Sequence, residues 1–273
     1  MNSPAPILAC RVIVCGGVGG LGDNEQGGVP LLTVPRAILA AGAFVFGNFG
    51  DCLARGLPVF LVALLIEIGL GFFSQGFSIA GQVISMILFS IFAVSWHRYT
   101  LLPAERMRKG FALAFGLREI RFAGLAIGTT VLGLLVFLAF TALLTSGIGA
   151  IIGLVIMAPV YMTVLFMYPA IALDQPLDLS LFLKKGVSLI LSYIVALGMV
   201  MLILVAPLAI LFFAMNLITD IFDHSTAATI ILLVVNLFLS VLFVAITVTT
   251  ASFLYRDMIG LRGEAAPPSP PGA

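Results

Sequence analysis

Charged residues are scarce in this sequence, and their scarcity limits what kind of protein it can be. Asp, Glu, Lys and Arg make up 9% of the 273 residues, whereas an average soluble domain carries roughly 25%. Hydrophobic residues make up 62%, which is more than a soluble domain of this length can hide in its interior. The composition therefore argues against a water-soluble globular protein and favours lipid as the surrounding solvent.

Histidine and cysteine are also rare, and neither residue type is grouped. The sequence has two histidines and three cysteines, and Cys10, Cys15 and Cys52 form no C-x-x-C pair. Metal ligation is therefore not predicted, and a cytoplasmic location would keep the thiols reduced. The formal net charge of +1 gives no reason to expect nucleic acid as a partner. The polar segments contain no nucleophile–base pair or phosphate loop, so we predict no cofactor and no enzymatic activity.

Long, unbroken apolar runs are what the sequence has in abundance. A helix of about 20 apolar residues crosses the ~30 Å hydrocarbon layer and keeps its backbone hydrogen bonds internal. Barrel strands would instead alternate over segments of about ten residues. We therefore predict an all-α polytopic membrane helix bundle over 57–255. Its six predicted transmembrane helices are 57–73, 77–96, 122–144, 148–168, 187–215 and 227–254.

The basic residues that flank these spans predict their orientation. All 13 Lys and Arg residues precede the first span, follow the sixth, or lie between the second and third or the fourth and fifth spans. These four segments share one side of a six-span bundle. Because cytoplasmic connections are enriched in Lys and Arg, both termini are predicted to be cytoplasmic.

The two ends of the chain differ from this pattern. Residues 1–33 contain a G-x-G-x-x-G sequence, but the residues after it cannot supply the helix that a dinucleotide fingerprint needs. We expect a flexible leader there, or translation that begins near Val29. Residues 34–56 predict an interfacial amphipathic segment, because polar residues interrupt it too often for a span. Residues 256–273 predict a short disordered cytoplasmic tail, because they end in a proline-rich run.

Glu67 is the single charged residue inside a predicted span. It would lie roughly 15 Å deep at about 1.5 Å per residue, where a charged carboxylate needs a partner, a proton or water. One interpretation is a protonated Glu67 that bonds to Asn236 or Gln82. The other is a proton or cation site, and Glu67 and Asn236 would then belong to a small transporter or channel. These two residues form the candidate intramembrane polar site.

The connection over 97–121 is the richest polar segment. Trp96 and Tyr99 at its start suit the membrane interface, where amphipathic rings gather. Its basic side chains are candidate contacts for anionic lipid headgroups, because each adds about 1 kcal/mol of attraction near the surface. Membrane lipids are therefore the predicted partners, either at a specific site or through a loop that only sets topology. The candidate contacts are Arg98, Arg106, Arg108, Lys109, Arg118 and Arg121.

Two local patterns predict how helices begin and pack. Asp178 precedes Leu179-Ser180-Leu181 and predicts the N-cap of a helix. The small-residue pairs Gly124-x-x-x-Gly128 and Gly149-x-x-x-Gly153 predict close packing of helices inside the bundle.

Two polar runs next to the spans carry a resemblance to a known family. They are Tyr168-Pro-Ala-Ile-Ala-Leu-Asp174-Gln-Pro176, followed by Lys184-Lys185-Gly186, and Tyr255-Arg256-Asp257-Met258. Over about 55–260, the chain resembles the six-span membrane domain found beside some bacterial glycerophosphodiester phosphodiesterases and in stand-alone inner-membrane proteins. The resemblance implies a bacterial inner-membrane protein, and it carries over no catalytic residues because the chain lacks the acidic and histidine clusters of that enzyme. We expect a structural, lipid-interacting or accessory role.

Overall fold

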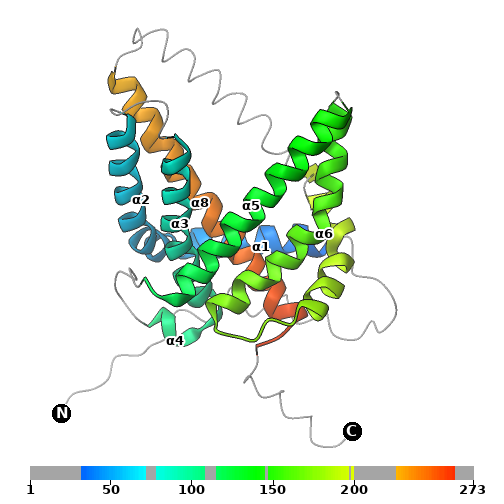
Figure 1. The fold of residues 1–273 in the computed structure, drawn as a ribbon. Coiled ribbons are helices and arrows are strands. Elements are labelled where there is room, and N and C mark those ends of the chain that lie inside the picture. Colours follow the sequence, from blue (N-terminus) through cyan, green and yellow to red (C-terminus); the bar gives the residue numbers. More distant parts are fainter. Residues whose placement is uncertain are drawn as a thin grey trace, which may run out of the picture.

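The computed structural model describes residues 32–71, 78–107, 115–144, 147–196, 198–199 and 226–261. Every regular element in these ranges is a helix, and six helices are long and apolar enough to cross a membrane (Figure 1). The predicted all-α multi-pass bundle is therefore confirmed. The helices are α1 (Thr33–Gly47), α2 (Phe49–Gly71), α3 (Ser78–Leu101), α4 (Pro103–Arg106), α5 (Leu117–Leu144), α6 (Gly147–Ala172), a helix described over Leu179–Ala196, and α8 (Thr226–Met258).

Two spans begin about two turns earlier than the sequence predicts. Helix α2 begins at Phe49 rather than at residue 57, and the fifth span begins at Leu179 rather than at residue 187. At the start of α2, Arg55 and Asp51 bond to side chains of α3, so the helix need not end at them. The rest of the predicted fifth span lies largely outside the described residues, as do most of the predicted leader and tail.

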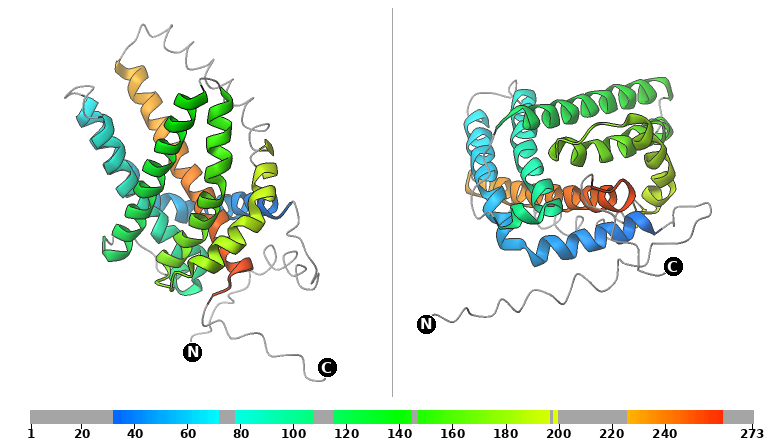
Figure 2. Two further views of the ribbon diagram at one scale, coloured as in Figure 1. Left: turned by 45° about the vertical axis from the view of Figure 1, so that its right-hand side comes forward. Right: turned by 90° about the horizontal axis from the view of Figure 1, so that it is seen from below.

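Helix α1 has no counterpart among the predicted spans. Residues 34–56 are not one interfacial segment, because the chain turns at Asn48 and separates α1 from α2. Figure 2 shows α1 lying across the spans, and α8 lies beside it. In the same views α2 stands next to α3, and α5 pairs with α6. Helix α1 is therefore an integral element of the bundle.

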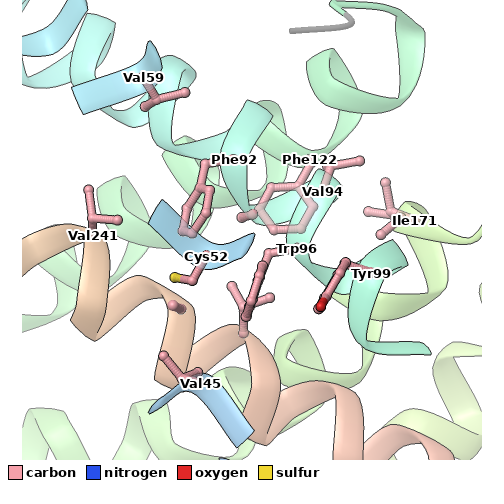
Figure 3. Packing of buried hydrophobic residues seen from close by; sticks show 14 residues of the cluster. Val45, Cys52, Val59, Phe92, Val94, Trp96, Tyr99, Phe122, Ile171 and Val241 are labelled. Carbon is pink, nitrogen blue, oxygen red and sulfur yellow. The ribbon is translucent and has the colours of Figure 1, made fainter. Parts of the chain in front are cut away.

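Two clusters of buried apolar side chains form the core, and α1 contributes to both. The first surrounds Trp96 and includes Val45 of α1 (Figure 3). The second joins α6, the helix Leu179–Ala196 and the end of α8, and it includes Val34 of α1. Trp96 is 0% and Tyr99 3% exposed, so these rings lie in the core and not at the lipid interface that the sequence suggests.

The two predicted glycine pairs differ in their surroundings. Gly153 of α6 lies in van der Waals contact with Phe140 of α5, where an added Cβ would be 3.5 Å from the Phe140 Cβ. Around Gly124 and Gly128 no atom lies within 4 Å of an added Cβ. Of these residues Gly153 therefore seats α6 against α5, whereas Gly124 and Gly128 face open space.

Candidate functional site

Polar side chains gather where the ends of several helices meet, and we call this region the polar end. It lies where α2, α5 and the helix Leu179–Ala196 begin and where α3, α6 and α8 end. Hydrogen bonds between side chains far apart in the sequence hold these ends together. Its members are Asn48, Asp51, Arg55, Ser95, Arg98, Tyr99, Glu105, Arg106, Arg118, Asp174, Gln175 and Tyr255.

The Tyr99 hydroxyl joins α3 to the start of α2. It donates to Asp51 Oδ2 at 2.6 Å and lies 3.2 Å from Asn48 Oδ1. Asn48 in turn donates from Nδ2 to the Phe44 carbonyl at 2.8 Å, which caps the C-terminal end of α1. These bonds satisfy polar groups at a partly buried helix junction.

Arg55 carries a charge into α2 that the apolar interior would not accept alone. Its guanidinium donates to Ser95 Oγ and to the Glu105 carbonyl, both at 3.0 Å. The same group lies 4.9 Å from the centre of the Tyr99 ring, within the range of a cation–π contact. Arg55 is only 9% exposed, so it belongs to the interior of the polar end.

The sequence contains a signal for this cluster that we interpreted differently. Asn48, Asp51 and Arg55 are three and four residues apart, and residues with that spacing share one face of a helix. Along the sequence they interrupt an apolar segment. In the structure they form the polar face on which α2 meets α3.

Two arginines close the C-terminal end of α3. Arg106 donates from Nε to the Tyr99 carbonyl at 3.1 Å and from Nη2 to the Thr100 carbonyl at 2.8 Å. These carbonyls belong to the last turn of α3, where intrahelical donors run out. Arg98 forms an ion pair with Glu105, with 2.7 Å between Nη2 and Oε1, and also donates to the Ala172 carbonyl at 3.4 Å.

Asp174 lies two residues after the end of α6, in the turn that follows the helix. Its φ of 54° is the one positive value at a non-glycine residue in the described chain, and the Gln175 amide donates back to the Ala170 carbonyl at 2.8 Å. The Asp174 carboxylate pairs with Arg118 of α5. The Arg118 guanidinium holds the pKa of the Asp174 carboxyl below its ordinary value.

Gln175 connects the same turn to α8, because the Tyr255 hydroxyl donates to its Oε1 at 2.6 Å. The two polar runs that carry the family resemblance thus meet at the polar end.

Hydrogen bonds between α3 and α8 continue from the polar end into the core. Trp96 Nε1 donates to Thr249 Oγ1 at 2.8 Å, and His97 Nδ1 lies 2.7 Å from Ser252 Oγ. Each hydroxyl donates its own hydrogen to a carbonyl of α8. The direction of the bond between His97 Nδ1 and Ser252 Oγ follows the tautomer of the imidazole.

The candidate intramembrane site lies partly outside the described residues. Glu67 belongs to α2, but its side chain lies outside the described part. Gln82 of α3 is exposed. Asn236 is also exposed.

The predicted headgroup contacts fall into three groups. Arg98, Arg106 and Arg118 donate to groups of the protein itself. Arg121 is exposed. Arg108 and Lys109 lie outside the described residues.

Among the described residues no three His, Cys, Asp or Glu side chains gather as a metal site would require. The polar end therefore offers hydrogen bonds and charge, and most of its polar groups already bond to one another. Comparison with family models, curated proteins and solved structures found no match to this chain.

Proposed function

We propose that this chain is a non-catalytic multi-pass protein of a bacterial inner membrane whose polar end binds anionic lipid headgroups. Both termini lie on the cytoplasmic side in this proposal. The connections at the opposite ends of the spans contain no Lys or Arg. The cations of the polar end would then face the cytoplasmic leaflet, whose anionic lipids attract them.

The observation that carries this proposal is a division among the basic side chains. Arg55, Arg98 and Arg118 each donate to protein acceptors. Arg36 and Arg121 are exposed, and in the described part of the chain neither contacts a carboxylate. The same holds for Lys184 at the start of the fifth span. Arg36, Arg121 and Lys184 therefore have no carboxylate partner in the described part of the chain. These three cations are available to bind phosphate oxygens.

A lipid-retention experiment tests the proposal. The protein is placed in nanodiscs that contain equal amounts of phosphatidylglycerol and phosphatidylcholine, and the lipids that remain bound are identified by native mass spectrometry. Each exposed cation contributes about 1 kcal/mol near the surface, or roughly fivefold in affinity. We therefore expect the double variant Arg121→Gln with Lys184→Gln to lose much of its enrichment in phosphatidylglycerol.

The matched control removes a charge at the same end. Arg256 contacts Asp257 at 3.5 Å and lies over the Phe253 ring, so Arg256→Gln should retain more of the enrichment than either Arg121→Gln or Lys184→Gln. Equal retention by the wild-type protein and the double variant would contradict the proposal.

The alternative of a transporter or channel rests on sequence alone. The Glu67 side chain lies outside the described residues, so this alternative stays a prediction.

A further inference from the structure

Beyond Arg36 in its first turn, helix α1 is apolar on two opposite faces, which an amphipathic helix at a water interface is not. Its inner face contains Val34, Ala41 and Val45, all buried. Its outer face contains Leu39 and Phe46, which are 68% and 63% exposed in the isolated chain, with the exposed Ala43 between them. The spacing of these three residues places them on one side of the helix.

Helix α1 is fixed in place at both ends. Near its start, the Val34 amide has no intrahelical acceptor, and it donates to Ser192 Oγ at 2.9 Å. Near its end, the Phe44 ring contacts the rings of Trp96 and Phe253, with centres 6.2 and 5.7 Å away. The outer face is thus held outward and is not free to turn toward the core.

The outer face of α1 continues onto the lipid-facing surface of a span. Beyond Phe46, the exposed side chains Leu53, Leu57 and Leu61 follow one another along α2 at intervals of four residues. Helix α2 is one of the six membrane-crossing helices, so this side of it meets acyl chains. The exposed apolar side chains thus run from Leu61 of α2 to Leu39 of α1, and the exposed Arg36 lies on the same side of α1 in its first turn.

Neighbouring cations indicate the depth of α1. The Arg106 guanidinium lies 5.3 Å from the centre of the Phe44 ring, and the Arg256 guanidinium lies 5.4 Å from that of Phe253. Arginines beside apolar rings typically reach toward the headgroups while the rings remain below them. At 15 residues, or about 22 Å, α1 is also too short to cross the bilayer.

We propose that α1 lies in the plane of the membrane, with Leu39 and Phe46 immersed in the acyl chains of the leaflet next to the polar end. The occupant of this surface is lipid, because the surface is continuous with that of α2 and because α1 lies across the spans (Figure 2). This inference does not depend on headgroup binding by Arg121 and Lys184.

The chain has one tryptophan, which makes fluorescence a direct test. Leu39→Trp is made in a Trp96→Phe background and reconstituted in vesicles whose phosphatidylcholine is brominated either near the headgroup or near the chain end. We expect stronger quenching by the shallow bromine. The matched control, Leu132→Trp near the middle of α5, is exposed as well and should be quenched more strongly by the deep bromine.

Two outcomes would overturn the proposal. Quenching of Leu39→Trp by aqueous iodide but not by brominated lipid would place the outer face in water. Protection from both quenchers would show that a second copy or another protein covers it. Phe46→Trp repeats the measurement at another position of the same face. Variants that keep Trp96, whose ring is fully buried, preserve the test if Trp96→Phe fails to fold.

Discussion

At the scale of single residues, polar groups in this protein are satisfied by partners distant in the sequence. Asp178 is an exception that the sequence predicted, since its carboxylate accepts the Leu181 amide at 3.0 Å and caps the helix. Such a cap is local, so a pattern of four residues reveals it. The bond between Tyr99 and Asp51 crosses 48 positions, and no local pattern could reveal it.

Asp174 combines a left-handed backbone with an ion pair, and substitutions can separate the two. Asp174→Asn retains a residue that tolerates positive φ and removes the ion pair with Arg118. Because the Asp174 side chain is 54% exposed, we expect a loss of about 0–1 kcal/mol. Asp174→Ala should lose roughly 1–2 kcal/mol more, because alanine is strained at that φ. Thermal unfolding in detergent measures both. Equal stability of the two variants would contradict the role of the backbone.

The lowered pKa of the Asp174 carboxyl predicts that the stability of the protein depends on pH in the acidic range. Arg118 is the main cause of the lowered pKa of Asp174, and the charges of Arg98 and Arg121 act in the same direction. A group whose folded pKa is lowered contributes stability that is fully present above its unfolded pKa, about 4, and is lost as pH falls through the folded value. Unfolding temperatures of the wild type and Asp174→Asn should therefore converge as pH falls below about 4.

At the scale of helices, packing depends on a few positions where backbones approach closely. A Cβ added to Gly186 would lie 3.0 Å from the Met162 carbonyl carbon and from the Thr163 amide nitrogen. Backbone atoms of α6 cannot move aside as a flexible side chain can. The helix Leu179–Ala196 is therefore seated against α6 at this glycine. Its place in the Lys-Lys-Gly run gave no indication of that contact.

Gly186→Ala should accordingly destabilise the protein by roughly 1–3 kcal/mol, because the helix must shift to admit the methyl group. Gly128→Ala is the matched control, since no atom lies within 4 Å of an added Cβ there. We expect little change in its unfolding temperature in detergent. A large loss of stability in Gly128→Ala, with none in Gly186→Ala, would show that this account of the packing is wrong.

At the scale of the whole molecule, six membrane-crossing helices and the transverse α1 bring most polar side chains of the described part to one end. Helix α1 contributes to both apolar clusters, so the region before the first predicted span is structurally integral. The sequence predicts one interfacial amphipathic segment over 34–56, whereas the structure divides that range between α1 and α2.

The proposed orientation can be measured directly. A reporter inserted at His224, in the predicted connection between the fifth and sixth spans and outside the described residues, should read outside the cytoplasm. Reporters fused after the last residue should read cytoplasmic, because all Lys and Arg residues flank the spans on that side. A cytoplasmic signal at His224 would require an odd number of spans or the opposite orientation.

The sequence by itself determined that the protein lies in a membrane, that it is all-helical, and how many spans it has. These follow from properties summed along the chain, namely apolar length and the need of each helix to satisfy its own backbone. Tertiary structure decided which cations are structural, that Trp96 and Tyr99 are buried, and that α1 lies across the bundle. Those outcomes depend on pairs such as Arg55 with Ser95 and Trp96 with Thr249, which come together only when the helices pack.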